Sequence, residues 1–218
     1  MQEIIFGLIS FLIAVLSFFL GAVKLFKGKK PLYLRLFVCA AGCFAIQQLS
    51  YIVNLWCDIP SAVSIGSFGI FGCNFFLLSA NYGTLDKVVD DGKGSKTAKI
   101  IAVIAPVFMA VLAAVSFMFW KNKDILGAWL WLIILLPSLP ASYFNLKHIL
   151  LPMDPFEFLR ATKLCNIAAI VFYIVTAVYV ILSSLSNSVV SGISSVFMSL
   201  SVLWLTLCAV KGAEKWGI

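Results

Sequence analysis

The chain has 218 residues, of which 62% are hydrophobic and only 11% are charged, and its mean hydropathy is +1.07. A soluble domain keeps about a quarter of its residues charged because its surface faces water, so this composition excludes an ordinary soluble protein. The net charge of +7 would suggest a nucleic-acid partner for a soluble protein. In a membrane protein the same excess arises from the basic residues of cytoplasmic loops. We therefore expect the lipid bilayer, and no nucleic acid, as the partner.

Seven long apolar segments follow one another along the chain, joined by short polar loops. A helix crosses the bilayer core, which is about 30 Å thick, in roughly 20 residues. We therefore expect an all-α, polytopic integral membrane protein in which residues 1–218 form a single seven-helix transmembrane domain. The expected helices span residues 4–26, 36–56, 61–82, 100–120, 125–146, 155–185 and 190–210.

The basic residues of the loops fall almost entirely on one side of the expected membrane. If the N-terminus is outside, the outer loops hold only Lys121 and Lys123, and the other 14 of the 16 basic residues lie on the inner side. Cytoplasmic loops carry an excess of Lys and Arg. The sequence therefore predicts an outside N-terminus, a cytoplasmic C-terminus, and a multi-pass location in a cell membrane, the plasma membrane of a bacterial cell.

Prolines and one capping motif predict where helices break and begin. Pro137 and Pro140 each remove a backbone donor, which predicts a kink or local opening in the fifth helix. Pro106 predicts the same for the fourth helix. Asp154 followed by Pro155 matches a helix start, because Asp is a favoured N-cap and Pro a favoured first helical residue.

Small residues and tryptophans predict which surfaces pack against one another. Gly66, Gly69 and Gly72 recur at three-residue intervals in the third segment, which favours close approach to a neighbouring helix. The serine-rich start of the seventh segment favours a central position for that helix as well. We expect Trp131 and Trp204, which lie deep in their segments, to pack between helices.

Ionisable residues are missing from the middle of every expected span, and this restricts the chemistry. Such residues mark ion paths and proton relays, so proton pumping is disfavoured, and a rhodopsin is rejected because the last span has no lysine for retinal. The lone histidine, His148, lies beside Lys147 at the end of the fifth span, which is typical of a solvated flank. No hydrolase or metalloprotease motif occurs. We therefore expect a non-enzymatic protein with no catalytic residues, metal or cofactor.

Uncharged polar residues inside the spans are the remaining indication of function. Gln47, Tyr51 and Asn54 recur at i, i+4 and i+7, which places them on one helix face. Such a face cannot lie against lipid, because its amides need partners. It either joins helices by hydrogen bonds or lines a pocket for a neutral polar small molecule, open toward the outer side. On the second interpretation the ligand-binding residues are Gln47, Gln48, Tyr51, Asn54, Asn74 and Asn81.

Two functions fit these features. The leading one is a sensor-like, receptor-like or partner-binding module that signals through a separate cytoplasmic protein, which would dock on Lys93, Lys96, Arg160 and Lys163. The alternative is a small transporter for a neutral polar solute with a 3+1+3 helix layout. The layout is similar to that of SWEET-type sugar transporters and to the seven-helix input modules of bacterial sensors, in architecture only. The chain lacks the Pro-Gln pair and the first-helix proline of the transporters.

Overall fold

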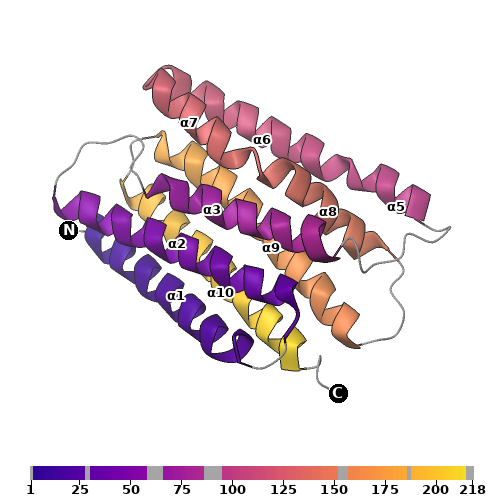
Figure 1. Cartoon of the computed structure of the whole chain (residues 1–218). Helices are drawn as coiled ribbons and strands as arrows, with labels where there is room; N and C mark the ends of the chain where they lie inside the picture. Colours follow the sequence, from indigo (N-terminus) through magenta and orange to yellow (C-terminus); the bar gives the residue numbers. More distant parts are fainter. Residues whose placement is uncertain are drawn as a thin grey trace.

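The computed structural model describes residues 2–27, 30–57, 66–85, 95–151, 157–185 and 188–214. The described residues form helices and no β-strand, which confirms the all-α prediction for them. The helices lie side by side in one bundle (Figure 1). In chain order they are α1 (Gln2–Leu25), α2 (Leu32–Trp56), α3 (Ser67–Leu78), the π-helix η1 (Ser79–Leu85), α5 (Ser95–Ala102), α6 (Ile104–Lys121), α7 (Ile125–Leu135), α8 (Ser138–Leu150), α9 (Glu157–Ser183) and α10 (Ser188–Glu214).

Within the described residues, six helical stretches are long and apolar enough to cross a membrane. They are Gln2–Leu25, Leu32–Trp56, Lys96–Lys121, Ile125–Leu150, Thr162–Ser183 and Val189–Glu214. The third expected span is not among them, because α3 has only 12 residues before it passes into the seven-residue η1. Residues 61–65 of that span lie outside the described residues. The structure is thus compatible with a multi-pass membrane protein that has six candidate spans.

Large apolar side chains cover the outside of the bundle. On α6, for example, Val107, Val111 and Met118 are all exposed. Soluble monomers rarely expose continuous apolar patches of this size. Hydrocarbon is a suitable solvent for such a surface, because each helix satisfies its own backbone hydrogen bonds.

α9 and α10 hold the bundle together. α10 packs along α1 and α9, and α9 also contacts α6 and α8 (Figure 1). In the core, Phe44 of α2 meets Phe172 of α9 edge to face, with the ring centroids 5.9 Å apart. Most of the buried serines of α10 bond to carbonyls of their own helix, as Ser199 does to Ser195 at 3.1 Å, whereas Ser195 bonds to Gln48 of α2. The expected central position of this serine-rich helix is confirmed.

A glycine allows α2 and α3 to approach closely. A Cβ atom added to Gly69 would lie 2.5 Å from the carbonyl oxygen of Cys43 and 2.7 Å from the Cβ of Gln47. No side chain can occupy that space, so the expected role of this glycine as a packing residue is confirmed.

The helix breaks predicted from prolines are present. α7 ends at Leu135 and α8 begins at Ser138, with Pro137 in the intervening turn. α5 ends at Ala102, four residues before Pro106, because Pro106 has no N–H to bond the Ala102 carbonyl. The helix start predicted at Asp154 lies outside the described residues, and α9 is described from Glu157.

The two tryptophans expected between helices differ. Trp131 is buried and packs against Tyr179, with the rings 6.4 Å apart. Trp204 is 40% exposed on α10, so the prediction was wrong for it. Its indole therefore reaches the outer surface of the bundle.

Candidate functional site

One end of the bundle, called here the lysine-rich end, gathers the last turns of α1, α8 and α10 and the first turns of α2 and α9 (Figure 1). Two hydrogen bonds join these turns. The ammonium of Lys30 donates to the carbonyl of Ala213 at 2.7 Å, and the hydroxyls of Tyr33 and Thr162 lie 3.1 Å apart. Helix ends that are far apart in sequence are therefore fixed to one another here.

A buried hydrogen-bond network lies just inside this end. The Nδ2 atom of Asn81 in η1 donates to Oδ1 of Asn145 in α8 and lies 3.3 Å from the carbonyl of Leu77. With Nδ2 turned to these two acceptors, the Oδ1 atom of Asn81 lies 3.2 Å from Nδ1 of His148. Because an amide oxygen only accepts, Nδ1 of His148 must carry a proton in this arrangement.

The π-helix explains why Asn81 can reach both partners. A π-helical segment has a wider turn than an α-helix and is frequent at functional sites. η1 follows α3 directly and packs against α2 and α8. The carboxamide of Asn81 is therefore directed toward α8, where Asn145 and His148 lie almost one helical turn apart.

The prediction for His148 was wrong. It is completely buried, and Lys147 beside it is only 3% exposed, so neither residue is a solvated flank. The reason is tertiary: α5, η1 and α9 all pack against α8 and cover its end. The sequence showed the residue type, but not the elements that cover it.

Several buried polar atoms on α3, α8 and α9 have no hydrogen-bond partner among the described residues. They are Oδ1 of Asn74, Nδ2 of Asn145, both amide atoms of Asn166, and the hydroxyl of Tyr173. The carboxamide of Asn145 faces the Tyr173 hydroxyl, but no well-formed hydrogen bond joins them. Asn166 precedes Tyr173 by seven residues and so lies on the same face of α9. We call Asn74, Asn81, Asn145, His148, Asn166 and Tyr173 the polar core.

The six predicted ligand residues are distributed over several helix contacts. Gln48 on α2 accepts from the Ser195 hydroxyl of α10 at 3.3 Å, and Gln47 packs against Gly69. Tyr51 lies against Gly7 of α1 and is half-buried, as is Asn54.

The other two predicted residues belong to the polar core. Asn74 donates to the carbonyl of Ile134 at 3.1 Å, beside the break between α7 and α8. Asn81 bonds Asn145. Asn145, Asn166 and Tyr173 were not predicted as members of this cluster. In the sequence these residues differ from their neighbours only in being polar within an apolar span, and many residues that merely pack between helices share that property.

The predicted partner-binding residues are described only in part. Lys96 is exposed and Lys163 is half-buried near the lysine-rich end. Lys93 and the side chain of Arg160 lie outside the described residues. Their role in binding a partner stays a prediction.

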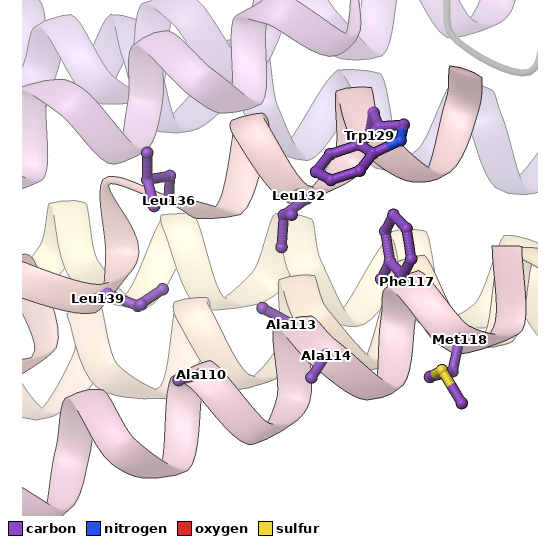
Figure 2. A pocket seen from close by; sticks show the side chains of 9 residues that line it. All are labelled: Ala110, Ala113, Ala114, Phe117, Met118, Trp129, Leu132, Leu136 and Leu139. Carbon is purple, nitrogen blue, oxygen red and sulfur yellow. The ribbon is translucent and has the colours of Figure 1, made fainter. Parts of the chain in front are cut away.

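An apolar hollow of about 330 Å³ lies between α6 and the α7–α8 segment (Figure 2). The hollow exists because several α6 side chains on this face are small alanines. Trp129, Leu132 and Leu136 line it from the other side. A second hollow of about 400 Å³ lies between α9 and α10 and is also apolar. Both are lined almost wholly by hydrocarbon, and no polar-core residue lines either one, so they suit lipid chains rather than a polar ligand.

Comparisons with known proteins give no relative: no family model, no curated protein and no solved structure matches the chain.

Proposed function

We propose that the chain is a seven-span sensor or partner-binding module of the plasma membrane, with its N-terminus outside and its C-terminus in the cytoplasm. It performs no chemistry of its own and signals through a separate cytoplasmic protein. The observation that supports this proposal is the polar core, where buried donors and acceptors without partners adjoin a network that joins η1 to α8.

The seventh span would be formed by α3 together with η1. The segment Ser67–Leu85 has 19 described residues, which extend about 28 Å at the α-helical rise, close to the 30 Å of a bilayer core. It packs along α2 and against α7 and α8. With this span included, the two termini lie on opposite sides of the membrane.

The input to the sensor is a neutral polar molecule bound in the polar core. Buried polar atoms are almost always hydrogen-bonded in native proteins, and each buried donor or acceptor without a partner costs free energy. Asn166 and Tyr173 offer two donors and an acceptor. A ligand with hydroxyl or amide groups would satisfy these atoms without requiring an opposite charge.

The output is a shift of α8. The break at Pro137 separates α8 from α7, so α8 can tilt without moving α7. α8 carries Asn145 and His148 of the polar core, and it ends at the lysine-rich end. A ligand that binds one position of α8 more tightly shifts the population toward it, and the neighbouring loops present that change to the partner.

Variants that remove the unpartnered atoms test the proposal. Neutral polyols, sugars and amides are screened for an increase in the melting temperature of the purified protein in detergent. A ligand of the polar core stabilises the wild type and loses its effect in Asn166→Leu and Tyr173→Phe, while Ser116→Ala, a buried change on α6, keeps it. If no solute binds and Asn166→Leu is simply more stable, the polar core is a structural feature and the proposal fails.

A transporter is the second candidate, because buried polar residues occur at different levels of the bundle: Gln48 and Ser195 lie in the second half of α2 and the first half of α10, and Asn81 and His148 lie in η1 and the last turn of α8. Uptake of the identified solute into proteoliposomes separates the two functions. Binding without uptake supports a sensor. Uptake that Asn166→Leu abolishes would replace the sensor by a transporter.

A further inference from the structure

A third hollow, with different chemistry, lies at the lysine-rich end, between the last turns of α1 and α10. Its volume is about 290 Å³. Lys24, Lys27 and Lys30 line it together with a single acidic residue, Glu214. It is separate from the polar core and does not depend on the function proposed above.

The charge in this hollow is strongly positive. Three ammonium groups face one carboxylate, and no carboxylate of the described chain pairs with Lys24, Lys27 or Lys30 within 4 Å. Like charges that are held together without counter-ions repel one another. An anion placed between them would relieve the repulsion and gain charge-assisted hydrogen bonds.

One of the three lysines is fixed in place. Lys30 donates to the carbonyl of Ala213 in the last turn of α10 at 2.7 Å and is half-buried. This bond uses one of the three ammonium protons and satisfies a carbonyl at the helix end. Lys24 and Lys27 are exposed at the end of α1, so their side chains can change conformation to fit around a bound anion.

The rest of the lining is apolar and continues onto the membrane-facing surface. Val23 is 52% exposed on the outer side of α1, and Val210 faces the hollow from α10. Both helices are candidate spans that end here, so the hollow lies where the hydrocarbon gives way to headgroups. A ligand that fits must be anionic at one end and apolar at the other.

We propose that this hollow binds the phosphate group of an anionic membrane lipid, with Lys24, Lys27 and Lys30 holding the phosphate and Val23 and Val210 contacting the start of the acyl chains. Basic hollows between spans are suited to anionic headgroups. The shared chemistry is a phosphate, which free phosphate also carries, and the test below separates the two sources.

The melting temperature of the purified chain is measured in zwitterionic detergent with added phosphatidylglycerol, phosphatidylcholine or inorganic phosphate. Phosphatidylglycerol is expected to raise it by about 3 °C, through preferential binding to the folded state, and phosphatidylcholine to have no effect. The test variant is Lys24→Gln with Lys27→Gln, which keeps the Lys30 bond to α10. The matched control is Lys96→Gln with Lys163→Gln, which removes two lysines near the same end but away from the hollow.

The proposal requires the phosphatidylglycerol shift to be lost in the test variant and kept in the control. Mass spectrometry of lipid that remains bound after purification must show the same pattern. Equal shifts in the test variant and the wild type would overturn the site, and equal loss in the control would assign the effect to general surface charge. Inorganic phosphate that reproduces the full shift would overturn the assignment to a lipid.

Discussion

The Oδ1 atom of Asn81 lies 3.2 Å from Nδ1 of His148, and this contact links the π-helix η1 to α8 inside the bundle. The same carboxamide donates to Asn145 through Nδ2. Asn81 therefore uses both of its polar atoms to hold α8, whereas Asn145 keeps Nδ2 without a partner. The hydrogen-bonding atoms of Asn81 are thus all paired, while its neighbour Asn145 keeps an unpaired donor, and such partly satisfied buried groups are costly in a low-dielectric interior.

Replacement of Asn81 by leucine is expected to destabilise the protein. It leaves Oδ1 of Asn145 without its donor and removes the Asn81 acceptor of His148, and buried polar groups that lose partners cost about 1–3 kcal/mol. Unfolding in a mixed-detergent titration measures the change. A double-mutant cycle with Asn145→Leu isolates the Asn81–Asn145 pair, and a coupling energy of zero would show that this hydrogen bond contributes nothing.

Gly69→Ala is expected to be the most damaging of the glycine-to-alanine changes. Its Cβ would lie 2.5 Å from the Cys43 carbonyl, which is backbone and cannot rotate away, so α2 and α3 must separate. We expect a loss of about 1–3 kcal/mol, as for other overpacked sites.

Gly72→Ala and Gly7→Ala are graded controls for that change. The Cβ at Gly72 meets the side chain of Cys43, with the sulfur at 3.0 Å and the Cβ at 3.4 Å, and the Cβ at Gly7 has ordinary contacts from 3.4 Å. Thermal unfolding of the three variants checks the order. A Gly7→Ala variant as unstable as Gly69→Ala would contradict close packing as the cause.

Trp120→Phe is expected to loosen the contact between α6 and α9. The Trp120 indole donates from Nε1 to the carbonyl of Val180 at 2.8 Å, and phenylalanine keeps the apolar bulk without the donor. The expected loss is about 1 kcal/mol, a typical net value for one hydrogen bond. Trp129→Phe is the matched control, because Trp129 is 53% exposed and its replacement is expected to be nearly neutral. Similar losses for both variants would assign the effect to ring size.

The positions of helices were predictable because they depend on local physics. Apolar segments of sufficient length and prolines that remove a donor act within their own turn, so the break at Pro137 could be inferred from the sequence. The short, partly π-helical form of the third segment could not be, because Ser79–Leu85 has no sequence feature that distinguishes a π-turn from an α-turn. The burial of His148 depends on α5, η1 and α9, which lie far from it in sequence.

The polar core was predictable only in part for the same reason. Asn74 and Asn81 stood out as amides in an apolar span, and both belong to it. Gln48 stood out equally, but it bonds Ser195 in a different contact. Helix periodicity assigns a residue to a face, but not to the helix that this face meets, and that depends on the packing of the whole bundle.

The orientation in the membrane can be read from a native thiol. Cys57 is exposed directly after α2, at the end opposite to the lysine-rich end, whereas Cys73, Cys165 and Cys208 are buried. With the N-terminus outside, Cys57 faces the exterior. We therefore expect a membrane-impermeant maleimide to label intact cells, and Cys57→Ser to abolish that labelling.

Two cysteines introduced into the Cys57→Ser background complete this experiment. Lys121 and Lys96 lie at opposite ends of the same candidate span, Lys96–Lys121, and both are exposed. Lys121→Cys is expected to react in intact cells and Lys96→Cys only after permeabilisation, because the positive-inside rule places the loops with most lysines in the cytoplasm. The reverse pattern would invert the topology, and it would then place the lysine-lined hollow of α1 and α10 in the outer leaflet.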